Sequence, residues 1–269
     1  MAPSRRHLLR ATALAASGPA AGGAVGYRLD RHRISETGDG LEESAALEAR
    51  LESTFGDRFE GLDPDRLDLL VDVREVGDAS VTPETARRIE SLFRAHDIHL
   101  QWLVHPEPID RRWFEGSFGY DAGRILWGPG SFYRRIDPWL RRSALQLVVV
   151  HGTQGAGDEG VLSSPLAGAT GGLFGRSVNG YSLGSRAAVA TRRDREEEAS
   201  LVLHELAHLG LCHATDPAND GVMGSAERVG LTESEWDQLR RRVSNVHETT
   251  GLDVMLRPCL WRETLEGLV

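Results

Sequence analysis

The run His204-Glu205-Leu206-Ala207-His208 contains residue types at the spacing needed to hold a metal ion and move a proton. Residues four apart lie one turn apart on the same face of a helix, so His204 and His208 can bind one zinc ion from the same side. Glu205 lies beside the first ligand, from where it can take a proton from a zinc-activated water and pass it to a leaving amine. The pattern predicts zinc-dependent hydrolysis with Glu205 as the catalytic residue.

The residues after this run supply candidates for a third ligand. Gly210 follows where a helix commonly ends in a left-handed residue, and a chain that reverses there can bring His213 back to the metal. Asp216 is the alternative third ligand, because a carboxylate also binds zinc. Met223 comes next, flanked by glycines in the run Gly221-Val222-Met223-Gly224.

This segment resembles the metzincin clan of zinc peptidases, whose pattern is H-E-x-x-H-x-x-G-x-x-H followed by a methionine turn. The first five positions match directly, whereas Gly210 and His213 each come one residue early. The resemblance implies that His204, His208 and His213 bind one catalytic zinc ion and that Met223 forms a hydrophobic floor beneath them. It also implies a metalloendopeptidase whose substrate is a peptide or protein.

Two other interpretations of the motif remain open. A buried helix can carry two hydrogen-bonded core histidines without any metal. Alternatively, the chain is a non-catalytic zinc-binding domain of metzincin shape with a structural or binding role, because the missing residue could close or distort the site. The presence of Glu205 counts against this alternative, since a purely structural zinc site does not need that carboxylate.

Composition limits the classes of function. The chain has 269 residues, enough for one domain of ordinary size with extensions. Its net charge is -9 and all 31 basic residues are arginine, a balance that argues against nucleic acid as a partner. The two cysteines, Cys212 and Cys259, exclude a four-cysteine zinc knuckle and allow one disulfide if the protein is exported. We expect a monomer.

The N-terminal segment, residues 1–26, resembles a twin-arginine export signal or anchor. Arg5 and Arg6 precede a stretch rich in alanine and glycine that carries no charge. The segment predicts an extracellular or cell-surface protein that contacts a membrane only there, if the segment is not cleaved. Residues 27–63 are polar and predict a linker or a pro-segment, with one short helix over residues 42–54.

The remaining chain predicts an α+β fold, with the catalytic domain over residues 64–248 and a tail over residues 249–269. A threonine cap and a proline open a helix at Thr82, and Thr232 with Glu235 forms a capping box for a last helix. Apolar runs predict strands at 67–76, 98–104, 125–127, 145–150 and 187–191. The element order matches the metzincin catalytic domain, which has a mixed twisted sheet, a backing helix, a long active-site helix and a C-terminal helix.

In the metzincin arrangement the last strand before the active-site helix lies along the substrate cleft, so residues 187–191 are expected near it. The preceding stretch, Gly152–Gly184, is rich in glycine and predicts a surface loop. Asp158 and Glu159 in this loop could bind a structural calcium ion, since carboxylate oxygens are the ligands that calcium prefers.

Overall fold

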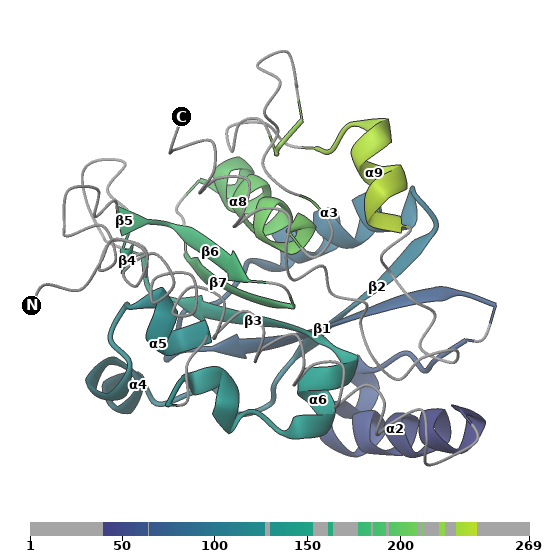
Figure 1. The fold of residues 1–269 in the computed structure, drawn as a ribbon, viewed down its shortest axis with the longest axis horizontal. Coiled ribbons are helices and arrows are strands. Elements are labelled where there is room, and N and C mark those ends of the chain that lie inside the picture. The colour runs from purple at the N-terminus through teal and green to yellow at the C-terminus, as the bar shows by residue number, and fades with distance from the viewer. Residues whose placement is uncertain are drawn as a thin grey trace, which may run out of the picture.

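The computed structural model describes residues 40–63, 65–126, 130–152, 161–163, 177–183, 185–191, 194–208, 211, 221–223 and 230–240. These residues form a five-stranded mixed sheet with helices on both of its faces (Figure 1). The predicted α+β class and mixed sheet are therefore confirmed. No helix in the described part of the chain has both the length and the apolar character that a membrane crossing requires.

The strand order in the sheet is β2-β1-β3-β7-β6. Four strands are parallel, and β6 pairs with β7 in the antiparallel direction. The strands are β1 (Leu67–Glu75), β2 (Ile98–Val104), β3 (Leu145–Val150), β6 (Gly180–Leu183) and β7 (Arg186–Ala190). A separate pair consists of β4 (Leu162–Ser163) and β5 (Ser177–Val178).

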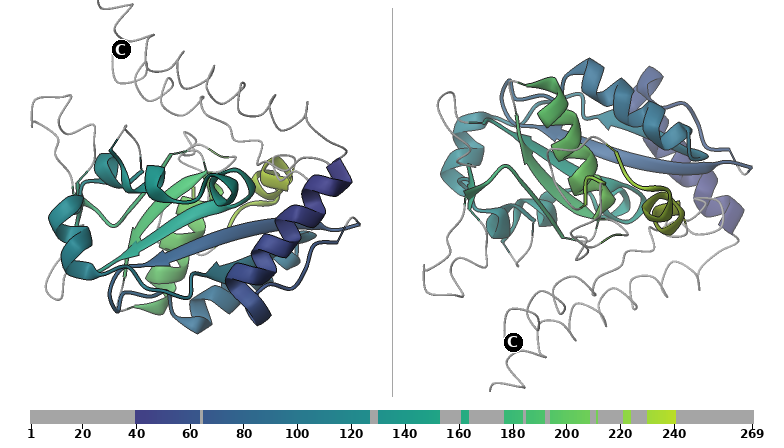
Figure 2. Two further views of the ribbon diagram at one scale, coloured as in Figure 1. Left: turned by 90° about the horizontal axis from the view of Figure 1, so that it is seen from below. Right: turned by 90° about the horizontal axis from the view of Figure 1, so that it is seen from above.

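Alternate residues of the buried strands pack into two separate hydrophobic cores, because successive side chains point to opposite faces of a sheet. Leu69 and Val71 belong to one core, whereas Leu70 and Val148 belong to the other. The first face carries α3 (Pro83–Arg94), α8 (Arg195–Ala207) and α9 (Glu233–Arg240). The second face is covered by helices that Figure 2 shows from two sides: α2 (Gly40–Phe55), α4 (Arg111–Ser117), α5 (Ala122–Leu126), η2 (Phe132–Arg135) and α6 (Pro138–Ser143). A short 3-10 helix, η1 (Gly56–Arg58), follows α2.

A buried carboxylate joins α8 to the start of α3. Glu198 Oε2 accepts hydrogen bonds from Thr82 N at 3.2 Å, Thr82 Oγ1 at 2.9 Å and Thr85 Oγ1 at 2.6 Å. The predicted cap of α3 is confirmed, because Thr85 N donates to Thr82 Oγ1. The two helices on the first face are thus fixed to each other at one end as well as by their apolar contact.

The capping box of α9 is also confirmed. Thr232 N donates to Glu235 Oε2 at 2.8 Å, and Glu235 N donates to Thr232 Oγ1 at 3.4 Å. Trp236 then packs edge-on against Phe93 and stacks on His96 with ring centroids 4.3 Å apart. These ring contacts place α9 against the C-terminal half of α3.

The strand predicted at residues 125–127 is wrong for Ile125 and Leu126, and Trp127 lies outside the described residues. The structure has α5 there, and the Asp121 carboxylate accepts hydrogen bonds from the backbone N–H groups of Gly123 and Arg124 at its start. Ile125 and Leu126 are buried together with Ala122, which is the spacing of a helical face. A short apolar run is compatible with either element, so the packing partners decided which one formed.

The helix predicted at residues 42–54 is confirmed as α2. Leu47, Leu51, Phe55 and Phe59 are buried in the core on the second face of the sheet. Residues 47–59 thus pack against the sheet, and the interpretation of residues 27–63 as a linker or pro-segment stays a prediction.

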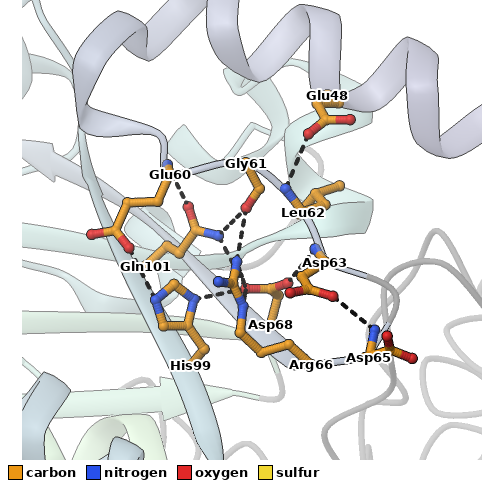
Figure 3. A network of polar contacts seen from close by, with 10 residues as sticks. All are labelled: Glu48, Glu60, Gly61, Leu62, Asp63, Asp65, Arg66, Asp68, His99 and Gln101. Carbon is orange, nitrogen blue, oxygen red and sulfur yellow. Dashed lines mark hydrogen bonds and ion pairs between the residues drawn. The ribbon is translucent and has the colours of Figure 1, made fainter.

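A network of polar contacts connects the segment after α2 to the start of β1 and β2 (Figure 3). Asp68 is 1% exposed and lies 2.8 Å from His99 Nδ1, 2.9 Å from Arg66 Nε and 3.1 Å from Gln101 Nε2. His99 Nε2 is 3.0 Å from Glu60, a side chain that is 64% exposed. A buried carboxylate with this many donors is a strong constraint, because each donor loses its partner if the carboxylate is removed.

We expect Asp68→Ala to lower the free energy of unfolding by about 3 kcal/mol, since it removes an acceptor from the half-buried Arg66 and from the buried amide of Gln101. Glu60→Ala should lower it by less than about 1 kcal/mol, because an exposed ion pair is screened by water. Urea unfolding of both variants measures the difference. Equal losses would show that Asp68 is not the centre of this network.

Candidate metal centre

The helix α8 carries His204, Glu205 and, at its C-cap, His208. Asp194 caps its first turn by accepting hydrogen bonds from Glu196 N at 2.8 Å and Glu197 N at 3.0 Å. The acidic first turn suits the partial positive charge of a helix N-terminus. Apolar side chains on the same helix are buried in the core of the first face: Val202, Leu203, Leu206 and Ala207.

The two histidines converge as the sequence predicts. His204 Nε2 and His208 Nε2 are 3.2 Å apart, and the two ring planes are nearly perpendicular. Two nitrogens that each bind a tetrahedral zinc ion at about 2.05 Å must lie about 3.3 Å from each other. The separation of the two Nε2 atoms therefore fits one shared zinc ion.

The other ring nitrogen of each histidine faces a backbone carbonyl. His204 Nδ1 lies 2.9 Å from Val222 O, and His208 Nδ1 lies 3.1 Å from Leu211 O. A carbonyl oxygen can only accept, so each Nδ1 carries a proton, and Nε2 is the nitrogen of each ring that lies at the point of convergence. This is the arrangement by which proteins orient metal-binding histidines.

The predicted methionine lies on the turn that supplies one of these carbonyls. Val222 N donates to Gly230 O at 2.7 Å, which fixes the turn, and Val222 O faces His204. Met223 is 2% exposed and belongs to the core that also contains Leu206. The turn thus joins the hydrophobic core to the orientation of His204.

The side chain of Glu205 extends from α8 to the edge strand β6. It is 6% exposed, and burial raises the pKa of its carboxyl to about 8, an effect that a hydrogen bond with Ser182 partly offsets. A Cβ atom added at Gly180 would overlap Glu205 Oε1, so the carboxyl lies directly against the backbone of β6. In the metal-free protein the carboxyl is mostly protonated at neutral pH.

Several predicted site residues lie outside the described part of the chain. They are both candidate third ligands (His213 and Asp216), the candidate calcium ligands (Asp158 and Glu159) and the two cysteines (Cys212 and Cys259). Within the described residues, no third His, Cys, Asp or Glu joins His204 and His208 in a metal-binding group. The identity of the third ligand stays a prediction.

The strand predicted at 187–191 is β7, which lies inside the sheet between β3 and β6. The strand at the edge beside α8 is β6, in a stretch that the sequence analysis interpreted as a loop. Sequence reasoning therefore missed Gly180 and Ser182, and it also missed the carbonyls of Leu211 and Val222. The short strand β6 was not predicted because it lies in a glycine-rich stretch. A backbone carbonyl is present in every residue, so its role cannot be predicted from the sequence.

Similarity of this chain to known proteins is found among solved structures. No family model matches the chain, and no curated protein matches it. A solved structure that it resembles is archaemetzincin from Methanopyrus kandleri, with a TM-score of 0.40 and 17% sequence identity. The alignment covers 65% of this chain and 94% of that one.

The raised pKa of Glu205 gives a pH-dependent stability in the metal-free protein. The folded state binds a proton that the unfolded state releases near pH 4.5, so stability falls as the pH rises from there towards 8. We expect the free energy of unfolding to fall by about 3 kcal/mol between pH 4.5 and 7. Glu205→Gln, which stays neutral, should flatten this curve in urea unfolding with a chelator present. Parallel curves for the two proteins would contradict the assignment.

Proposed function

We propose that this protein is a zinc-dependent metalloendopeptidase. The observation that carries the proposal is the convergence of two Nε2 atoms at 3.2 Å, with both Nδ1 atoms fixed by carbonyls and a buried carboxyl on the next residue. The same two Nε2 atoms are within hydrogen-bond distance of each other, so their separation suits a shared metal ion as well as a shared proton. A carboxyl beside that point supplies the proton-transfer group that hydrolysis requires.

His204 and His208 would hold the zinc ion, with His213 as the proposed third ligand and Asp216 as its alternative. When bound, zinc would polarise the scissile carbonyl and lower the pKa of a water molecule. Neutral imidazoles and one further nitrogen or oxygen ligand form a donor set that zinc binds with an open position.

Glu205 would act as the general base and then donate the proton to the leaving nitrogen. Its buried carboxyl is poorly solvated, and a nearby divalent cation favours the charged form that accepts a proton. Hydrogen bonding with Ser182 also favours the carboxylate. The position of the carboxyl against β6 brings this base to the edge of the sheet.

The edge strand supports a peptide as the substrate. Among the described residues β6 is the last strand in the order β2-β1-β3-β7-β6, and we propose that an extended peptide adds to it through backbone hydrogen bonds. Such pairing would place a scissile bond beside α8. For the whole chain we further propose export through the twin-arginine-like segment and function as a monomer outside the cell.

A non-catalytic zinc domain is the second candidate. The burial of Glu205 favours it, because a carboxyl between helix and strand can also serve as a neutral hydrogen-bonding group. The two candidates differ in activity and not in zinc content. Both require zinc at His204 and His208, whereas only the peptidase requires Glu205 for hydrolysis.

The decisive variant is therefore Glu205→Gln, which keeps the size of the side chain and removes its basic carboxylate. We expect zinc content to stay at one ion per chain while the cleavage of fluorescein-labelled casein falls by about 100-fold or more. Zinc measured by elemental analysis serves as the control for an intact site. Full activity in this variant would exclude the mechanism, and inactivity of the wild type with zinc bound would favour the non-catalytic candidate.

Zinc content also identifies the third ligand. We expect His204→Ala and His213→Ala each to lose most of the zinc in the exported chain, residues 27–269, and Asp216→Ala to retain it. Removing one of three ligands lowers affinity strongly because the remaining two leave the ion incompletely coordinated. Retention of zinc in His213→Ala together with loss of zinc in Asp216→Ala would identify Asp216 as the third zinc ligand.

A further inference from the structure

The strand β6 presents two small residues to α8. Gly180 and Ser182 are alternate residues, so they lie on the same face of the sheet. Their partners on β7 are Val189 and Ala187, which belong to the core on the α8 side. Tyr181 between them packs against the core on the opposite side. The side of β6 that faces α8 is therefore defined by a glycine and a serine.

Gly180 has no side chain at the point where the Glu205 carboxyl lies. A Cβ atom there would overlap Glu205 Oε1 and come within 2.8 Å of Glu205 Cδ and 2.7 Å of Leu201 Cδ1. These separations are shorter than van der Waals contact, so any other residue would force a displacement. The atoms in the way are side-chain ends, which change rotamer more easily than the paired backbone of β6 moves.

The hydroxyl of Ser182 supplies the second constraint on the same carboxyl. It forms a hydrogen bond with Glu205, two residues along the strand from the close approach at Gly180. The backbone at Gly180 limits how far the carboxyl can extend, and the Ser182 bond fixes its direction. Neither constraint comes from the helix that carries Glu205.

We propose that Gly180 is a positioning residue for Glu205, and that the edge strand β6 sets where the general base lies. The inference rests on the proposed function for its catalytic consequence, because only a peptidase uses Glu205 as a base. The steric relationship between Gly180 and Glu205 stands on the geometry alone. An alanine at position 180 would leave the metal ligands intact and move the base.

Kinetics test the catalytic consequence. Gly180→Ala should keep one zinc ion per chain and lower kcat for a cleavable peptide by about 100-fold, the cost of misplacing a catalytic group by about 1 Å. KM should change by less than about twofold, since uniform substrate binding is not altered. Gly116→Ala is the matched control, because an added Cβ there meets nothing within 4 Å, and its kcat should not change. An unchanged kcat in Gly180→Ala would overturn the proposal.

Stability tests the steric relationship without using activity. In metal-free protein, Gly180→Ala should lower the urea midpoint, and the drop should be at least halved when Glu205→Ala removes the overlapping atoms. An equal drop in both backgrounds, or no drop in either, would overturn the assignment of Gly180. If the wild type cleaves no peptide, the proposed function fails, while this cycle still decides whether Gly180 positions Glu205.

Discussion

The hydrogen bond between His204 Nδ1 and Val222 O is the interaction on which the candidate centre depends. It places a proton on Nδ1 of His204 and directs Nε2 towards His208. The carbonyl of Leu211 does the same for His208, and Leu211 N in turn donates to Ala207 O at the end of α8. Both carbonyls belong to buried residues, so the hydrophobic core determines which nitrogen of each ring is available to a metal.

These carbonyls stay in place because the elements around them are fixed in several ways. Gly230 O holds the turn at Val222, and the stacking of Trp236 on His96 places α9, which follows Gly230 in the chain. At the other end of α8, Glu198 binds the capping residues of α3. The first face of the sheet thus forms one connected layer, in which a displaced helix would also displace a candidate metal ligand.

A perturbed carboxyl does not by itself identify a catalytic residue in this fold. Burial raises the pKa of Asp72 as well as that of Glu205. Asp72, however, lies on β1 and pairs with Arg74 at 2.9 Å, far along the sheet from β6 in the strand order. Glu205 differs because it adjoins two converging imidazoles, so its chemistry follows from its neighbours and not from its pKa alone.

The sequence by itself determined the features that depend on local spacing. Periodicity and capping chemistry over a few positions predict that His204, Glu205 and His208 share one helix. They also predict the caps of α3 and α9 and most of the strands. Tertiary structure decided the features that depend on contacts between distant segments. Residues 122–126 form a helix that buries its apolar face. The apolar side chains of residues 47–59 pack in the core on the second face of the sheet.

The same division applies within the site. Spacing indicated that two imidazoles could share an ion, but only the fold brought the carbonyls of Leu211 and Val222 to their Nδ1 atoms. Only the fold placed Gly180 and Ser182 against Glu205, because β6 pairs with β7 and lies against α8. Every residue has a backbone carbonyl, and Gly180 acts through the absence of a side chain. Neither feature can be recognised in the sequence, so these contacts depend on how distant segments pack together.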